Sequence, residues 1–213
     1  TREAGVRTLE RTIGTICRKV ARRIVTEEDF RSYSVKPADL EDLLGPAKFA
    51  KDKEERRDEI GLVNGLAWTS VGGELLPIEV AVMNGTGKIQ LTGSLGDVMK
   101  ESATTAITCI RTRAETLGIS PDFYAKKDIH IHAPEGAVPK DGPSAGIAMA
   151  TAVTSALCEE PIAHDIAMTG EITLQGRVLP IGGLREKSMA AYKNGMKTVI
   201  IPHGNIADLA EVD

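Results

Sequence analysis

Aromatic residues are scarce in this chain, and long apolar runs are absent. Phe, Trp and Tyr together make up 3% of the 213 residues, while hydrophobic residues of all kinds make up 42%. A core therefore has to be built mainly from Val, Ile, Leu, Ala and Met. No apolar stretch approaches the roughly 20 residues of a membrane-spanning helix, and there is no signal-peptide pattern, so we expect no membrane partner.

Cysteine is also rare, and neither sign of charge dominates. Cys17, Cys109 and Cys158 are unevenly spaced and fall within segments predicted as helices. This pattern predicts reduced core thiols in a cytosolic-type compartment rather than a disulfide framework. The formal net charge is −4, from 26 Lys and Arg residues against 30 Asp and Glu residues, and there is no basic stripe. Nucleic acid is therefore not indicated as a partner.

What the chain does contain is a serine in a setting suited to chemistry. Residues 139–146 read PKDGPSAG; an alternating segment at 128–133 predicts a half-buried strand before them, and an apolar segment at 147–158 predicts a buried helix after them. Ser144 thus stands at the start of a helix, where free backbone N–H groups and the helix dipole stabilise developing negative charge. Taken alone, the serine also fits an ordinary helix N-cap.

A lysine stands in a matching position farther along the chain. Residues 182–187 read GGLREK, which places Lys187 in the first turns of another helix, 43 positions after Ser144. An isolated lysine of this kind is usually solvated. A serine and a lysine that both begin helices behind glycine-rich turns instead suggest a Ser–Lys catalytic dyad.

The surrounding motifs resemble those of one family. Residues 139–146, together with 168–174 (MTGEITL) and 178–187 (VLPIGGLREK), resemble the proteolytic domain of Lon, the ATP-dependent protease. GLAWT at 65–69 and GSLGDVMKES at 93–102 extend the resemblance, which runs from about Gly61 to the end of the chain. It implies an α+β (mixed α/β) domain with the fold of the second domain of ribosomal protein S5, preceded by a small helical segment.

By this resemblance, Ser144 is the nucleophile and Lys187 is the general base of an acyl-enzyme mechanism. A lysine acts as a base only when it is neutral, so burial and nearby helix N-termini have to lower its pKa from the ordinary value of about 10.4. We expect the hydroxyl of Thr169 to orient the lysine amine. We also expect the oxyanion to be bound by the amide of Ser144 and by one more amide, from Asp141 or Gly142.

Two other schemes use a pair of histidines. Alternation places His130 and His132 on one face of the predicted strand, which suggests half of a metal site, but no third ligand follows at metal-ligand spacing and no metal is predicted. A Ser-His-Asp triad with one of these histidines stays open, because triads are recognised by geometry. The interpretation we favour is that both histidines line the cleft or pack beneath the serine loop.

One segment looks like a nucleotide-binding motif without being one. Residues 85–88 (GTGK) match the tail of a phosphate-binding loop, but that pattern requires Gly in place of Val82 and Ser or Thr in place of Ile89. Apolar alternation at 76–82 and 88–92, on either side of an Asn-Gly pair, predicts a β-hairpin instead.

Periodicity and turn signals predict several further elements: a long amphipathic helix at 2–26, a short strand at 33–35, a helix at 37–44, a helix at 94–117 and a final helix at 205–213. The last of these has no C-cap, and the family that the chain resembles continues beyond this point. We therefore expect the proteolytic domain to be truncated at its C-terminus.

The first residues resemble a different module. TREAGVR at 1–7 resembles the end of the AAA+ small helical domain that precedes the proteolytic domain in Lon, which implies that Arg7 contacts ATP phosphates; the alternative is a surface arginine. We expect three parts, a helical piece at 1–46, a charged linker at 47–60 and a proteolytic domain at 61–213. No cofactor is needed for the peptide-bond chemistry, whereas ATP with Mg²⁺ is expected in the ATPase module of a longer parent protein.

The resemblance also implies partners and a location. Substrates are expected to be unfolded polypeptides that add a strand beside the cleft, and the family's rings imply self-association into a homohexamer. A bacterial-like cytoplasmic protein is favoured over a mitochondrial-matrix one, because the segment around Asn84 carries no insertion. The alternative function is a catalytically silent Lon-like scaffold, but such relatives lose the serine and the lysine, which are both present here.

Overall fold

The computed structural model describes residues 3, 5–27, 31–47, 57–69, 72–134 and 139–212. The chain divides into two compact units, Thr1–Glu55 and Arg56–Asp213. In the described part of the chain, no helix is both long enough and apolar enough to cross a membrane.

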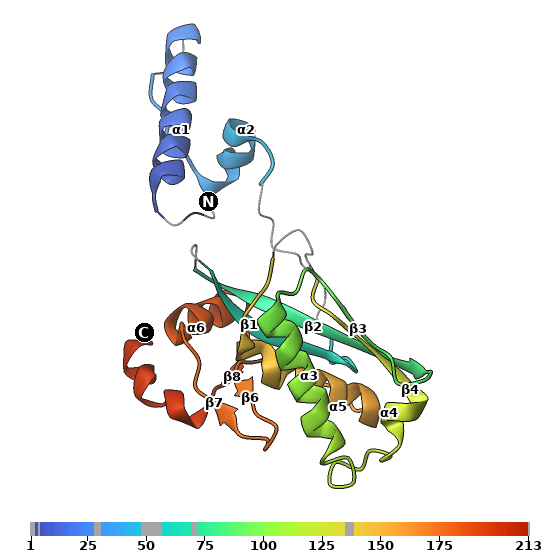
Figure 1. The fold of residues 1–213 in the computed structure, drawn as a ribbon. Helices are drawn as coiled ribbons and strands as arrows, with labels where there is room; N and C mark the ends of the chain where they lie inside the picture. Colours follow the sequence, from blue (N-terminus) through green and yellow to red (C-terminus); the bar gives the residue numbers. More distant parts are fainter. Residues whose placement is uncertain are drawn as a thin grey trace. The chain divides into compact units, whose positions relative to one another are not determined.

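The first unit is helical, and its long helix starts later than its amphipathic pattern predicts. Helix α1 spans Arg7–Thr26 rather than 2–26 (Figure 1). The carboxylate of Glu3 accepts hydrogen bonds from the backbone N–H groups of Thr8 and Leu9, at 2.7 and 2.8 Å. These groups belong to the first turn of the helix, which has no partner of its own for them. Glu3 therefore lies outside the helix, and its carboxylate accepts the hydrogen bonds of two N–H groups that have no acceptor within the helix.

The rest of this unit is a short helical turn. The 3₁₀ helix η1 (Pro37–Asp39) continues into α2 (Leu40–Leu44), and Gly45 follows with a φ of 83°, which confirms the predicted helix and its glycine stop. The predicted strand at 33–35 is wrong. These residues have no regular secondary structure, and among the described residues they pair with no neighbouring strand. Alternation over three residues could not reveal that a partner strand is missing.

The second unit is built on one mixed sheet, which confirms the predicted mixed α/β class (Figure 1). Its six strands lie in the order β3-β4-β2-β1-β5-β8. In chain order they are β1 (Leu62–Thr69), β2 (Gly72–Asn84), β3 (Ile89–Thr92), β4 (Lys127–His132), β5 (Ile166–Met168) and β8 (Thr198–Ile200). A separate two-stranded hairpin consists of β6 (Glu171–Ile172) and β7 (Val178–Leu179).

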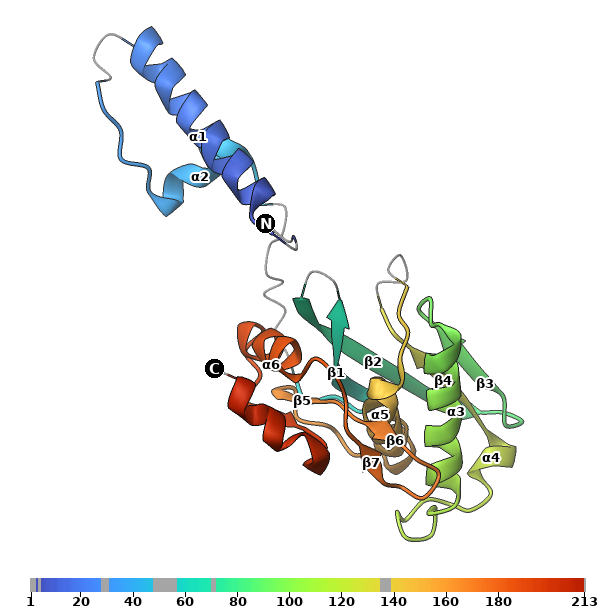
Figure 2. The same cartoon turned by 60° about the vertical axis from the view of Figure 1, so that its left-hand side comes forward.

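Helices occupy both faces of the sheet. They are α3 (Asp97–Arg111), α4 (Phe123–Lys126), α5 (Gly146–Cys158) and α6 (Leu184–Lys193), with 3₁₀ turns η2 (Pro143–Ala145), η3 (His203–Asn205) and η4 (Ala207–Glu211). Val63 and Ile78 share a core with residues of α3 and α5, which run beside one another in Figure 2. Leu66 points to the opposite face by strand alternation and packs in a second cluster with Ala191 of α6. The sheet therefore separates α5 from α6.

The predicted hairpin at 76–92 is wrong, although both of its strands exist. Strand β4 lies between β2 and β3, antiparallel to β2 and parallel to β3. The connection from β2 to β3 is held by Asp128, whose carboxylate accepts hydrogen bonds from the N–H groups of Thr86 and Lys88, at 2.7 and 2.8 Å. An Asn-Gly pair marks a turn, but it does not show that a strand from 40 residues away inserts between its two arms.

Two predicted helices differ at their ends. Helix α3 stops at Arg111, and turns continue to Gly118. The carbonyl of Cys109 accepts hydrogen bonds from the hydroxyl of Thr112 and the guanidinium of Arg113. These side chains take the place of the backbone N–H that would bond to this carbonyl if the helix continued. The predicted final helix at 205–213 is replaced by the 3₁₀ turns η3 and η4.

The three cysteines are free thiols, as predicted, but they do not share one environment. Cys109 is buried in the core, Cys158 is partly buried, and Cys17 is exposed on α1. The prediction that all three are core thiols is therefore wrong for Cys17, because the polar surroundings of its helix leave it facing solvent.

Candidate active site

Ser144 lies in η2, the 3₁₀ turn that leads directly into α5. Gly142 precedes this turn with a φ of 122°, a conformation that favours glycine. The N–H of Gly146 donates to the carbonyl of Pro143 and closes the turn. Ala145 and Ala148 are buried behind the serine and anchor the start of α5. The structure therefore confirms the predicted placement of Ser144 at a helix start.

Lys187 lies in the first turn of α6, also as predicted. Gly183 precedes the helix with a φ of 70°, and the indole of Trp68 packs against it. Gly73 packs just as closely on the next turn, because a Cβ atom there would lie 2.0 Å from the backbone oxygen of Glu186. Two glycines thus allow β1 and β2 to approach the beginning of α6.

The lysine and the serine meet in a hydrogen bond. Lys187 Nζ lies 3.0 Å from Ser144 Oγ and 3.1 Å from Thr169 Oγ1. The side chain of Lys187 is 2% exposed, and that of Thr169 is 1% exposed. Burial lowers the pKa of Lys187 to about 8, because desolvation disfavours the charged ammonium. About a tenth of this lysine is therefore neutral at pH 7, far more than for a lysine of ordinary pKa, and the neutral amine is the form that acts as a general base.

The three side chains converge where the pairing of the sheet stops. Strand β1 pairs with β5 only at Asn64 and Gly65, and the chain leaves β5 at Thr169. The last residues of β1 line the cleft instead. Ser144 approaches this point from α5 and Lys187 from α6, on opposite faces of the sheet. The catalytic pair therefore depends on how both faces pack against β1.

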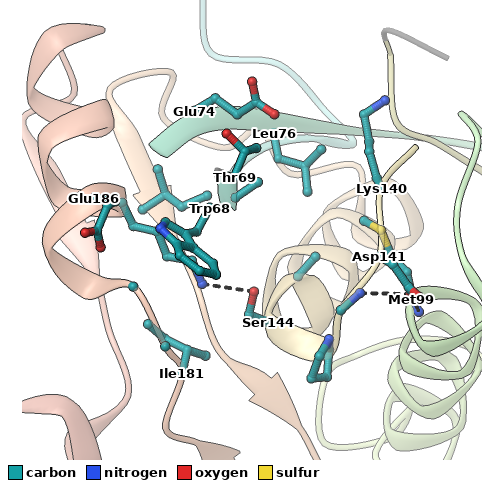
Figure 3. Close-up of a pocket in the computed structure, with 18 of the residues that line it drawn as sticks. Trp68, Thr69, Glu74, Leu76, Met99, Lys140, Asp141, Ser144, Ile181 and Glu186 are labelled. Carbon is teal, nitrogen blue, oxygen red and sulfur yellow. Dashed lines mark hydrogen bonds between the residues drawn. The ribbon is translucent and has the colours of Figure 1, made fainter. Parts of the chain in front are cut away.

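The pair lies in a cleft of about 670 Å³. Figure 3 shows two walls around Ser144, with Trp68, Ile181 and Glu186 on one side and Met99, Lys140 and Asp141 on the other. A dashed line in that view marks the bond between Ser144 and the lysine amine. The lining also includes apolar residues of β1, β2 and η2, namely Leu66, Ala67, Leu76 and Ala145.

The side chain of Asp141 has a structural role that sequence reasoning missed. Asp141 Oδ1 accepts hydrogen bonds from the N–H of Met99, at 3.0 Å, and from the N–H of Gly142, at 2.9 Å. It thus caps the start of α3 from another loop, next to Gly96, where a Cβ atom would lie 2.3 Å from the carboxyl carbon. Of the predicted oxyanion donors, the amide of Gly142 is therefore already hydrogen-bonded to this carboxylate.

The comparisons with known proteins agree with this geometry. Residues 34–213 match the Lon protease C-terminal proteolytic domain, and residues 1–33 match the Lon protease AAA+ ATPase lid domain. The chain belongs to the Lon protease family. It is 57% identical to the Lon protease of Vibrio parahaemolyticus, 55% to that of Geobacter metallireducens and 54% to that of Escherichia coli. Each match covers 100% of this chain but only 26–27% of the relative, so the chain spans about a quarter of their length.

The histidines do not take part in this Lon-type site. The rings of His130 and His132 flank the hydroxyl of Thr92, at 2.8 and 2.7 Å, and neither is among the described residues that line the cleft. The first alternative of the prediction, that they line the cleft, is therefore wrong, while packing beneath the serine loop stays a prediction. The hydroxyl of Ser144 bonds to a lysine rather than to an imidazole, which disfavours the triad. Across the described ranges, no three His, Cys, Asp or Glu side chains are grouped to hold a metal ion.

Two further predictions concern the lid-like part of the chain. Arg7 stands at the first position of α1 and lines a depression of about 480 Å³ with Arg11, Arg18 and the acidic Glu10. Guanidinium groups suit phosphate, so the chemistry fits the predicted nucleotide contact. The spatial division after Glu55 falls within the predicted linker at 47–60, and the family models divide the chain after residue 33. Most of the predicted linker lies outside the described residues; Asp58, near its end, belongs to the second unit and bonds to His164 of the same unit.

Proposed function

We propose that this chain is the proteolytic part of an ATP-dependent serine endopeptidase that degrades unfolded or misfolded proteins. The observation that carries the proposal is the 3.0 Å bond between Ser144 Oγ and the buried amine of Lys187. A buried lysine with a lowered pKa beside a serine at a helix start is costly for a scaffold and useful for an acyl-transfer enzyme. Membership of the Lon family supports the same assignment.

The reaction proceeds in two balanced halves. The neutral amine of Lys187 takes the hydroxyl proton of Ser144 while Oγ bonds to the carbonyl carbon of the substrate, whose π electrons move onto oxygen. The oxyanion then collapses, the C–N bond breaks, and the ammonium of Lys187 gives its proton to the departing amine. Water next attacks the acyl ester and passes a proton to Lys187; the C–Oγ bond then breaks, and the ammonium of Lys187 gives that proton to Ser144 Oγ, which releases the carboxyl product and restores the hydroxyl and the neutral amine.

Thr169 keeps the base in position. Its Oγ1 accepts a hydrogen bond from Lys187 Nζ and donates one to the carbonyl of Ser144, at 3.3 Å. The threonine therefore ties the base to the backbone of the nucleophile itself. The burial of both side chains excludes water and keeps the lysine pKa within reach of neutral pH.

Strand addition is the binding mode that the sheet favours. Residues 66–69 of β1 pair with β2 on one side, while their other side lies beyond the limited pairing with β5 and faces the cleft. An extended peptide beside this edge gains main-chain hydrogen bonds independently of its sequence. We propose unfolded polypeptides as the substrate class for this reason, since a folded chain has already paired its backbone groups.

The remaining assignments concern the longer protein. We propose that ATP with Mg²⁺ acts in an ATPase module, that Arg7 contacts the nucleotide there, and that the subunits form a homohexameric ring in the bacterial cytoplasm. The lid-domain match to residues 1–33, the arginines beside Arg7 and the bacterial relatives support these proposals. The peptide-bond chemistry itself needs no cofactor. This chain alone is expected to cleave unstructured peptides weakly and to leave folded proteins intact.

The test is hydrolysis of an unstructured fluorogenic peptide by the wild-type chain, Ser144→Ala and Lys187→Ala. We expect activity in the wild type only. A variant with both His130→Asn and His132→Asn serves as the control and keeps the activity, because neither ring reaches the serine. Activity that survives Lys187→Ala but is lost in the histidine variant contradicts the dyad. A wild type with no activity favours the scaffold alternative.

A further inference from the structure

One buried hydroxyl has no part in the mechanism above. Ser102 lies on α3, is 7% exposed, and is surrounded by apolar residues of the same helix. Thr104 and Thr108 on α3 return their hydroxyls to backbone carbonyls four residues earlier, the usual local bond for a helical hydroxyl. Ser102 instead donates to the carbonyl of Pro143, at 3.2 Å, in the turn that carries the nucleophile. Its bond therefore reaches another element.

The contact between Ser102 and this turn is close on two sides. A Cβ atom on Gly146 would lie 2.7 Å from Ser102 Oγ, so a glycine is needed for the start of α5 to approach the hydroxyl. The same Pro143 carbonyl also accepts the N–H of Gly146. Two donors from different elements therefore fix the direction in which this carbonyl points. Figure 2 shows the arrangement that allows this, with α3 running alongside α5.

The direction of the Pro143 carbonyl determines the direction of the Ser144 amide. Both groups belong to one planar peptide unit, which is trans, so the C=O and the N–H point in opposite directions. Because the carbonyl points toward Ser102 in the interior, the N–H points away from α3. The first N–H groups of a helix have no intrahelical acceptor, and Ser144 lines the cleft. The amide is therefore held ready for a negatively charged oxygen beside the nucleophile.

We propose that Ser102 is a positioning residue that holds the Pro143–Ser144 peptide so that the Ser144 amide binds the oxyanion. The hydroxyl touches neither the substrate nor the reacting atoms. It acts through the peptide plane, and it sets the geometry of the donor before substrate arrives. This inference rests on the proposed peptidase function, and the experiment below separates the failure of one from the failure of the other.

The test compares Ser102→Ala with the wild type in the 213-residue chain. Removing an entire oxyanion donor costs about 10²–10³ in kcat, so misdirecting one is expected to lower kcat about tenfold or more, with little change in KM. Ser102→Thr, which keeps the hydroxyl, is expected to recover most of the loss. Ser155→Ala is the matched control, since Ser155 is a buried hydroxyl near the far end of α5 that bonds to Glu160.

A second readout isolates the oxyanion. A peptide aldehyde reacts with Ser144 Oγ to form a hemiacetal, in which the former aldehyde oxygen occupies the oxyanion position. The peptide alcohol of the same sequence binds without this bond. Ser102→Ala is expected to weaken the aldehyde by the same factor as kcat/KM and to leave the alcohol unchanged.

Each outcome has a definite meaning. Selective loss of aldehyde affinity, with Ser155→Ala unaffected, supports the positioning role. Wild-type kinetics in Ser102→Ala overturn it. Equal weakening of aldehyde and alcohol, with a lowered melting temperature like that of Ser155→Ala, also overturns it and leaves a packing role. A wild-type chain that neither cleaves the peptide nor binds the aldehyde contradicts the proposed function itself, and this inference with it.

Discussion

The amine of Lys187 lies 3.0 Å from the hydroxyl oxygen of Ser144, although 43 residues separate them and their helices lie on opposite faces of the sheet. The two side chains meet beside the end of β1, after its pairing with β5 has stopped. A small shift of either helix against β1 changes this distance directly. Substitutions in the packing around β1 are therefore expected to affect activity more strongly than their effect on stability alone suggests.

The pH dependence of hydrolysis tests the base. Because burial lowers the pKa of Lys187 to about 8 and only the neutral amine accepts a proton, kcat/KM is expected to rise about tenfold per pH unit below pH 8 and to level off above it. Peptide hydrolysis across a range of pH, below and above the pKa, gives this profile. A rate that depends instead on a group titrating near pH 6.5 points to a histidine and contradicts the assignment.

The stability of Lys187→Met is expected to exceed that of the wild type near neutral pH. In the wild type the folded-state pKa is about 8, whereas an unfolded lysine has a pKa of about 10.4. Between about pH 8 and about pH 10.4 the unfolded chain binds more protons than the folded chain, so the free energy of unfolding of the wild type rises with pH. Below about pH 8 the lysine is charged in both states, and the folded state carries the full cost of desolvating the buried ammonium. The advantage of the methionine variant should therefore shrink as the pH rises through this window.

Urea unfolding at a pH below and a pH near the upper end of that window measures this effect. Lys193→Met, at the exposed end of α6, is the control, and its effect on stability is expected to be small. A Lys187→Met variant that is less stable than the wild type at every pH shows that the bonds to Ser144 and Thr169 outweigh desolvation.

Thr169→Val tests the orientation of the base at nearly constant volume. The substitution removes the hydroxyl that accepts from Lys187 Nζ at 3.1 Å, and we expect a fall in kcat of about tenfold or more, part of the 10²–10⁴ that general-base catalysis contributes. KM should change little, because the side chain is buried away from the substrate. Thr169→Ser keeps the hydroxyl and should retain most of the activity. Equal losses in the two variants contradict the orienting role, because the loss then follows the packing of the side chain and not the presence of the hydroxyl.

Gly73→Ala tests the contact between β2 and α6. The new Cβ atom would lie 2.0 Å from the backbone oxygen of Glu186, so the helix start has to move, at a cost of about 1–3 kcal/mol in the free energy of unfolding. We also expect a loss of peptidase activity, since Lys187 follows Glu186 directly. Gly182→Ala is the matched control in the same region, because nothing lies within 4 Å of its new Cβ atom. Chemical denaturation and peptide hydrolysis of both variants decide the point.

Local signals identified the residues that carry the proposed chemistry. A glycine-rich turn before an apolar helix predicted Ser144 at a helix start, and the same pattern predicted Lys187, because both signals lie within a few residues of the side chain concerned. Alternation likewise predicted strand β4, and composition predicted the apolar helix α5. These features depend on backbone preferences and periodicity, which a sequence displays directly.

Long-range pairing was not accessible in the same way. The insertion of β4 between β2 and β3 removed the predicted hairpin, and Asp141 caps α3 from 42 residues away. Neither partner lies near the segment that it completes, so no local pattern marks it. The histidines illustrate the same limit, because alternation placed them on one face of β4 but could not show that both rings contact Thr92 of β3 and that neither lines the cleft.

The sequence by itself determined which reactive groups the chain carries and that each begins a helix, because side-chain chemistry and helix starts are local properties. Only the tertiary structure decided that Lys187 is buried, that its pKa falls, and that its amine reaches Ser144. Burial and distance arise from the packing of β1 between helices that are far apart in the chain. The same serine and lysine on a differently packed sheet would remain a helix cap and a solvated cation.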